Sequence, residues 1–314
     1  MKTYLSLDYW KKLLLTFYRA FLSFSEDKCL KLSASLAYYS IFSIGPLLII
    51  IIWLLSFFYG KYYDDFSAKQ NVLDRITETF GAQSTDQLQT ILDNMLITAN
   101  SNIGILIGLG TLIFASTKVF IDIQDSINII WRIKPKPKKG WIKYILNRLI
   151  SFSMVLGLGF LLIASLLINS IILVLVNFFN EIIPGISNQM LNNLNIALTF
   201  IIITTTFGFI FKFLPDAKVR TKTVIFGAIL TSLLFMLGRF GLSIYLQNNA
   251  TASAFGAAGS IIILMLWVYY SAAILYYGAE FIKEYSNTFE DGIHPNNIAV
   301  LVKNTEIEID RTEQ

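Results

Sequence analysis

Six long apolar segments constrain the fold of this chain more than any other feature. They lie at about 32–59, 102–121, 149–177, 194–214, 224–246 and 256–281. A membrane-spanning helix needs about 20 mostly apolar residues, and inside lipid the backbone N–H and C=O groups must be satisfied within the segment. The segments lack the alternating character of a β-barrel. The sequence therefore predicts an all-α polytopic membrane protein with six transmembrane helices.

The Lys and Arg residues lie almost entirely on alternate sides of these segments. Twenty of the 25 fall before the first segment, between the second and third, between the fourth and fifth, and after the sixth, when Lys212 at the end of the fourth segment is counted with the connection that follows it. The opposite connections hold only Lys61, Lys69 and Arg75. Cytoplasmic loops of membrane proteins carry the excess of Lys and Arg. We therefore expect a multi-pass protein of the inner (cytoplasmic) membrane with both termini in the cytoplasm.

The parts outside the spans are predicted to be short. The first external loop, about 60–101, has the pattern of two short amphipathic helices, which form either a small lid or a solvated connector. Residues 1–285 are expected to form a single membrane domain. Residues 286–314 are expected to form a polar cytoplasmic tail that is partly disordered.

Residues 9–24 have the pattern of an amphipathic helix. Its predicted polar face holds Lys12, Thr16, Arg19 and Ser23. Aromatic and cationic faces of this kind are typical of helices that lie in the membrane interface, but a helix packed on the cytoplasmic ends of the spans fits equally well. The predicted apolar face consists of Trp10, Leu13, Leu14, Phe17, Phe21 and Phe24.

Polar residues inside spans are costly and often functional. Arg239 lies about two-thirds of the way across the fifth segment, if the segment is a helix that rises 1.5 Å per residue. Its side chain either faces the bundle interior or extends (snorkels) to the outer membrane interface. Small residues near the start of the sixth segment either pack helices together or belong to a re-entrant stretch at 247–260. The candidate polar path consists of Arg239, Asn169, Tyr245, Gly256, Gly259 and Ser260.

Ionisable residues also gather at the cytoplasmic ends of the segments. A lone carboxylate at the depth of Glu280 would be desolvated, so we expect a cation, Lys212 or Lys118, to hold it. Such a pair is either a structural link or a gate or coupling-ion site. The whole candidate set is Glu280, Lys212, Lys118, Asp122 and Asp125. Two prolines, Pro46 and Pro215, are expected to break helices.

The residues give no support to an enzyme. One histidine and one cysteine exclude a His/Cys zinc cluster, and neither a P-loop nor a GxSxG motif occurs. Asp122 and Asp125 carry oxygen ligands suited to Mg²⁺, but Lys118 beside them opposes that interpretation. We therefore expect no metal and no cofactor.

The expected partners are membrane lipids. Basic connections such as the KPKPKKG run at 134–140 attract anionic head groups. No specific nucleic-acid binding is predicted, and a homo-oligomer is left open.

Three stretches resemble the YihY/BrkB family of bacterial membrane proteins. Lys31–Pro46 is similar to the family's first-span signature, and Leu214–Asp216, followed by Val219 and Arg220, is similar to its motif after the fourth span. Tyr245–Glu280 is similar to its most distinctive region. The resemblance covers about residues 20–285.

The resemblance implies a six-span inner-membrane architecture without a settled biochemical activity. Members have been called virulence or serum-resistance factors and, through an old misassignment, ribonucleases. Phe255 stands where the family pattern has tyrosine, so no hydroxyl role is carried over there. The leading prediction is a transporter or lipid-handling protein. The alternative is a non-transporting scaffold or envelope-integrity factor, and a membrane-associated nuclease ranks third.

Overall fold

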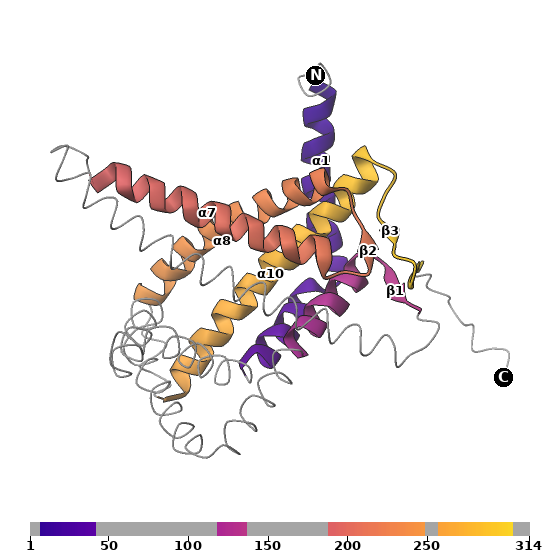
Figure 1. Ribbon diagram of the computed structural model, residues 1–314. Coiled ribbons are helices and arrows are strands. Elements are labelled where there is room, and N and C mark those ends of the chain that lie inside the picture. The colour runs from indigo at the N-terminus through magenta and orange to yellow at the C-terminus, as the bar shows by residue number, and fades with distance from the viewer. Residues whose placement is uncertain (1–6, 42–117, 137–187, 249–256, 304–314) are drawn as a thin grey trace, which may run out of the picture.

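The structure of the protein is a computed structural model that describes residues 7–41, 118–136, 188–248 and 257–303. The described part is mostly helical, with four short strands (Figure 1). Asn169, Gly256, Pro46 and the predicted external helices at 60–101 lie outside the described residues, as do most of the first three predicted spans. The helical segments 29–41 and 118–130 are the described ends of the first two.

Three of the six predicted spans are confirmed as apolar helices of spanning length. They are α7 (Asn188–Phe213), α8 (Thr221–Asn248) and α10 (Ala257–Phe289). The stretches long and apolar enough to cross a membrane are Ile196–Phe213, Thr221–Leu242 and Ile262–Phe289. They fall on the predicted segments 194–214, 224–246 and 256–281, because long Leu-, Ile- and Phe-rich runs satisfy their backbone only as helices in lipid.

The connection between α7 and α8 is short and firmly held. α7 ends at Phe213, where the approach of Pro215 disfavours helical geometry in the preceding residue. Asp216, which follows Pro215, forms two hydrogen bonds with Asn128. The Asn128 Nδ2 donates to Asp216 Oδ2 (3.1 Å), and the Asp216 N–H donates to Asn128 Oδ1 (3.0 Å). The Lys212 ammonium donates to the carbonyl of Val219 (2.6 Å), which closes the turn before α8 begins.

Two small antiparallel strand pairs lie together at one end of the helices (Figure 1), which we call the strand end. Strand β1 (Ile133–Pro135) pairs with β4 (Ala299–Leu301). Strand β2 (Ala217–Lys218) pairs with β3 (His294–Pro295). The segment after α10 therefore runs back over the loops that follow the 118–130 helix and α7.

This arrangement differs from the expected polar tail that begins at residue 286. The last helix continues to Phe289, and strands β3 (His294–Pro295) and β4 (Ala299–Leu301) follow it. A polar sequence signals exposure to water, but backbone pairing with two other loops still orders it. The remaining tail after residue 303 lies outside the described residues.

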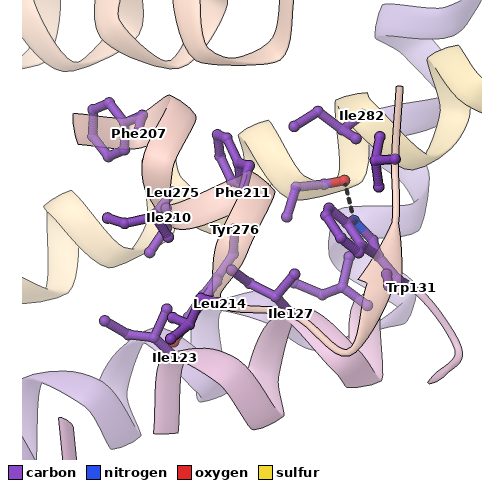
Figure 2. Close-up of a cluster of buried hydrophobic side chains, with 14 of the residues drawn as sticks. Ile123, Ile127, Trp131, Phe207, Ile210, Phe211, Leu214, Leu275, Tyr276 and Ile282 are labelled. Carbon is purple, nitrogen blue, oxygen red and sulfur yellow. Dashed lines mark hydrogen bonds between the residues drawn. The ribbon is translucent and has the colours of Figure 1, made fainter. Parts of the chain in front are cut away.

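The apolar core lies close to the strand end, where five helical segments meet (Figure 2). Its largest fully buried side chains include Trp131, Tyr276 and Phe211. The indole N–H of Trp131 donates to the carbonyl of Ala279 at 2.9 Å, so the ring is both packed and hydrogen-bonded. Deleting one such ring from a packed core costs about 3–5 kcal/mol.

Glycines allow α8 and α10 to pack closely. A Cβ atom on Gly278 of α10 would lie 2.0 Å from the Thr231 hydroxyl oxygen of α8. A Cβ on Gly227 of α8 would lie 2.2 Å from Ile282 Cγ1. Small residues at such crossings let two helix backbones approach, as is common between membrane helices.

Helix α1 (Leu7–Glu26) runs antiparallel along the last turns of α10. The rings of Tyr9 and Phe289 lie 5.2 Å apart, and farther along the pair the rings of Phe17 and Phe281 lie 4.8 Å apart. Near the end of α1, Phe24 meets Tyr277 at 6.0 Å. A helix is therefore present over the predicted 9–24, and one side of it packs on a spanning helix.

The predicted polar face of α1 needs one correction. Thr16, assigned to the polar face, is fully buried, and its hydroxyl donates to the Lys12 carbonyl at 2.9 Å. Trp10, Leu14 and Phe21, assigned to the apolar face, are 56%, 68% and 62% exposed, so the protein covers only part of that face. A threonine can satisfy its hydroxyl on its own helix, so it is buried at little cost.

Candidate functional site

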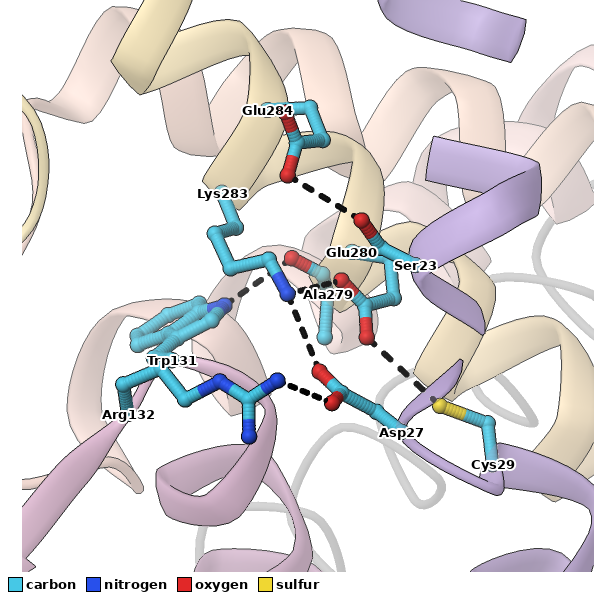
Figure 3. Close-up of polar contacts among 9 residues, drawn as sticks. All are labelled: Ser23, Asp27, Cys29, Trp131, Arg132, Ala279, Glu280, Lys283 and Glu284. Atoms are coloured by element: carbon cyan, nitrogen blue, oxygen red, sulfur yellow. Dashed lines mark hydrogen bonds and ion pairs between the residues drawn. The ribbon is translucent and has the colours of Figure 1, made fainter. Parts of the chain in front are cut away.

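Four charged side chains meet beside the core at the strand end (Figure 3). The Asp27 carboxylate is paired with both Arg132 and Lys283; the Lys283 Nζ–Asp27 Oδ2 distance is 3.1 Å. The same ammonium lies 2.5 Å from Glu280 Oε2. We call Asp27, Arg132, Glu280 and Lys283 the charge network. A chain of three ion pairs thus runs from Arg132 through Asp27 and Lys283 to Glu280.

Local backbone geometry places each member of the network. Asp27 lies in the turn after α1, where Lys28 has a positive φ of 52° and the next helix starts at Cys29. Arg132 has a φ of 56° in the turn between the 118–130 helix and β1. Such left-handed geometry costs a non-glycine residue about 1–3 kcal/mol, so the surrounding contacts must hold these turns. Glu280 and Lys283 share one face of α10, three residues apart.

The network is largely removed from water. The side-chain exposures are 0% for Glu280, 3% for Asp27, 12% for Lys283 and 35% for Arg132. Two carboxylates face two cations, so the charges balance. Desolvating such groups costs several kcal/mol per ion, which close pairing must offset. The partly exposed Arg132 guanidinium marks the side of the network that faces outward.

Two further contacts surround the charge network (Figure 3). The Cys29 thiol donates to Glu280 Oε1 at 3.7 Å, and the Ser23 hydroxyl donates to Glu284 Oε1 at 3.2 Å. Burial, followed by the carboxylates of Glu280 and Asp27, raises the pKa of the Cys29 thiol. Cys29 therefore stays protonated and acts as a donor rather than as a nucleophile.

The prediction that Lys212 or Lys118 holds Glu280 is wrong, because the partner is Lys283. The Lys212 ammonium is bonded to the Val219 carbonyl, and the Lys118 ammonium lies 4.9 Å above the Tyr39 ring. The predicted sixth span ends at residue 281, which leaves Lys283 outside it. Because α10 continues past that point, Lys283 lies one helical turn from Glu280.

The other acidic candidates lie apart from Glu280. Asp122 Oδ1 accepts a hydrogen bond from the Ser35 hydroxyl at 3.2 Å, which links the 118–130 helix to the 29–41 helix. Burial raises the pKa of Asp122, while the bond from Ser35 and the charge of Lys118 partly offset this effect. Asp125 is exposed. The five predicted residues therefore belong to several separate contacts.

Of the predicted polar path, Asn169 and Gly256 lie outside the described residues. Arg239 is exposed on α8, and the choice between the bundle interior and the outer interface stays a prediction. Tyr245 belongs to α8, and Gly259 and Ser260 belong to the first turn of α10. The end of the predicted re-entrant stretch, from residue 257, is therefore regular helix.

Three members of the network escaped prediction from sequence. Asp27, Arg132 and Lys283 each flank an apolar run, where a charged residue is ordinarily a solvated topology signal. A usable signal was the Glu280–Lys283 spacing, which pairs opposite charges one turn apart on a helix. Nothing in the sequence places Asp27 or Arg132 beside that turn.

The chemistry available to this site is the formation and exchange of ion pairs and the transfer of protons. Within residues 7–41, 118–136, 188–248 and 257–303, no group of three His, Cys, Asp or Glu side chains could hold a metal ion. The geometry so far defines a helical membrane protein whose apolar helices carry a buried, balanced charge network at one end.

Comparison with known proteins supplies the family. Residues 20–298 match the family described as virulence factor BrkB, and the chain belongs to this family. A UPF0761 membrane protein of Vibrio vulnificus (strain YJ016) is 30% identical over 287 residues, which cover 86% of this chain and 84% of the relative. A UPF0761 membrane protein of Photobacterium profundum is 28% identical over 261 residues, covering 81% and 76%. No solved structure matches.

Proposed function

We propose that this protein is a transporter or lipid-handling protein of the inner membrane, and that the charge network is a gate at its cytoplasmic end. The observation that carries the proposal is the complete burial of Glu280, which is held by Lys283 within a helix of spanning length. Ionisable residues within membrane helices are rare and commonly mark substrate, ion or proton pathways.

The network is suited to gating because its members come from three separate parts of the chain. Asp27 follows α1, Arg132 follows the 118–130 helix, and the remaining pair belongs to α10. If Lys283 gave up its pair with Asp27 and kept its pair with Glu280, α10 could move away from the turn after α1 while the ammonium retained a carboxylate partner. Transporters alternate between such arrangements when one group of helices moves against another.

The orientation that we propose places the strand end and both termini in the cytoplasm. The exposed cations of the described connections gather at that end, as the excess of Lys and Arg in cytoplasmic loops requires. These cations also suit anionic lipid head groups. They include Lys28, Lys31, Lys134, Lys136, Lys218, Arg220 and Lys222.

Labelling with an impermeant maleimide tests this orientation in intact cells. A cysteine at Asp86, in the first predicted external loop, should react from outside. Cysteines at Lys138 and at the exposed Asp291 should react only after the membrane is opened. Labelling of Lys138→Cys from outside would reverse the assignment.

The close packing of the strand end favours the second candidate, a non-transporting scaffold. Trp131, Tyr276 and Phe211 fill the space between the helices there. A gate would have to open within or beside this core. A scaffold would use the network as a fixed structural link that specifies how the helices pair.

A reconstituted system separates the two candidates. Proteoliposomes are tested with fluorescent phosphatidylglycerol and phosphatidylethanolamine for lipid movement, and by light scattering for entry of small polar solutes. A transporter moves at least one probe faster than empty liposomes, and Asp27→Asn alters that rate, whereas the matched surface change Asp291→Asn does not. Absence of movement for every lipid and solute probe leaves the scaffold.

We also propose that the protein is not an enzyme, and the nuclease remains the lowest-ranked reading. A nuclease needs an acid–base pair or a metal held close to the phosphodiester. The charge network engages its carboxylates with Lys283 and Arg132. Incubation of the purified protein with RNA and DNA in the presence of Mg²⁺ tests this proposal. If the protein cleaves either nucleic acid and Glu280→Gln abolishes the cleavage, the nuclease hypothesis is correct.

A further inference from the structure

Helix α1 has two apolar sides, and among the described residues only one of these sides packs against other helices. The covered side follows Leu13, Phe17, Ala20 and Phe24, at spacings of four, three and four residues, and it packs on α10. The second side points away from α10. Its large exposed side chains are Trp10, Leu14, Leu15, Tyr18, Phe21 and Leu22.

The polar surface of α1 is only a narrow strip. With 3.6 residues per turn, Trp10, Leu14, Tyr18 and Phe21 form one continuous stripe directly beside the covered side. Lys12 and Arg19 lie on the remaining strip, seven residues and about two turns apart. A helix that is apolar over two sides and charged along one strip is built for a boundary between an apolar and an aqueous phase.

Composition identifies the apolar phase. The exposed stripe ends in Trp10 and contains Tyr18, and these two amphipathic residue types concentrate at the level of lipid head groups. Lys11, Lys12 and Arg19 are exposed beside the stripe, where cations favour anionic lipids. A contact between protein copies would instead favour a charge-depleted centre.

Continuity with α10 places this stripe at a membrane. The Tyr277 hydroxyl donates to the Phe17 carbonyl at 3.4 Å, and the Phe17 and Phe281 rings are in contact. Both α10 residues belong to the stretch Ile262–Phe289, which is long and apolar enough to span. The side of α1 next to this contact therefore meets the lipid that surrounds α10.

From these observations we infer that α1 is a membrane-interface helix: its exposed apolar stripe enters the acyl-chain boundary, and Lys11, Lys12 and Arg19 bind anionic head groups. This interaction surface is independent of whether the protein transports anything. It also assigns a role to the side of α1 that does not contact α10.

Site-directed spin labelling of the full-length protein in nanodiscs tests this inference. The sole cysteine, Cys29, is buried, so the unmodified chain serves as the unlabelled background. Labels are placed by Leu14→Cys on the stripe and by Lys12→Cys on the polar strip. Collision of each label with lipid-soluble O₂ and with water-soluble Ni-EDDA is then compared in phosphatidylcholine and phosphatidylglycerol discs.

The expected result is opposite behaviour at the two positions. The Leu14→Cys label should collide more often with O₂ than with Ni-EDDA, and the Lys12→Cys label should show the reverse. In phosphatidylglycerol the Leu14→Cys label should shift deeper, and changing Lys11 and Arg19 to Gln should remove that shift.

Other outcomes overturn the inference in distinct ways. Equal access of Ni-EDDA to both labels would mean that α1 projects into water. Shielding of the Leu14→Cys label from both reagents would mean that a second copy of the chain covers the stripe. Identical depth in the two lipids would remove the proposed binding of anionic head groups.

Discussion

Replacing Lys283 by methionine removes the ammonium that two buried carboxylates share. Its Nζ lies 2.5 Å from Glu280 Oε2 and 3.1 Å from Asp27 Oδ2. After the change, Asp27 keeps its pair with Arg132, whereas Glu280 keeps the weak bond from the Cys29 thiol. The lost partner therefore matters chiefly at Glu280, which is fully buried.

Removing one partner of a buried ion pair costs about 3–5 kcal/mol, because the other charge is left desolvated. Lys283 retains 12% exposure and Glu280 can take up a proton, so we expect the lower end, about 3 kcal/mol. Adding Glu280→Gln removes the stranded charge and should restore about 1–2 kcal/mol. The exposed Lys222→Met is the matched control and should change stability by less than about 0.5 kcal/mol.

The free energy of unfolding is measured by titrating purified protein in mixed micelles with SDS and following tryptophan fluorescence. The fully packed Trp131 reports on the same region of the core. A loss below about 1 kcal/mol for Lys283→Met, within the usual range of exposed pairs, would refute the burial argument. So would a double variant that is no more stable than Lys283→Met alone.

Three further predictions concern packing, the α7–α8 loop and the thiol. Gly278→Ala should lower the free energy of unfolding by about 1–3 kcal/mol through overpacking. Gly241→Ala, whose added Cβ would meet nothing within 4 Å, should be neutral or stabilising by up to about 1 kcal/mol. The same SDS titration measures both variants, and equal effects would contradict the close approach of α8 and α10 at Gly278. Asn128→Ala should lower the free energy of unfolding by about 1–3 kcal/mol, because the buried carboxylate and backbone N–H of Asp216 lose their hydrogen bonds to Asn128. Hydrogen exchange at the Asp216 amide should accelerate, and an unchanged exchange rate would contradict the role of these two bonds. The Cys29 thiol, which is buried and whose pKa is raised, should react with maleimide in the folded protein far more slowly than in the unfolded chain at every pH between 7 and 9, and equal rates would contradict its burial.

The spanning helices were predictable because their physical cause is local. A run of apolar side chains dictates a helix in lipid wherever it occurs, so α7, α8 and α10 lie where their hydrophobicity indicated. The end of α7 is also local, since Pro215 acts on the residues directly before it. Errors arose at helix ends, where α10 runs eight residues past the predicted residue 281.

The charge network was not predictable because its cause is tertiary. Sequence reasoning found that Glu280 needs a cation, but desolvation specifies the sign of the partner and not its identity. Asp27 and Arg132 come together only because α1, the 118–130 helix and α10 meet at the strand end. The packing of α1 was not predictable for a similar reason, since the apolar pattern could not show which apolar side of the helix α10 would cover.

The two strand pairs set an order for assembly. Strands β3 and β4 follow α10 in the chain, whereas their partners β2 and β1 precede it by long stretches. The ribosome therefore delivers the loops after the 118–130 helix and α7 well before anything can pair with them. During synthesis their backbone groups must be solvated or held by others, and the strand end can close only once the residues that follow α10 have been made. A chain that inserts α10 incorrectly cannot bring β3 and β4 to their partners, so the backbone groups of both loops then stay unpaired by these strands.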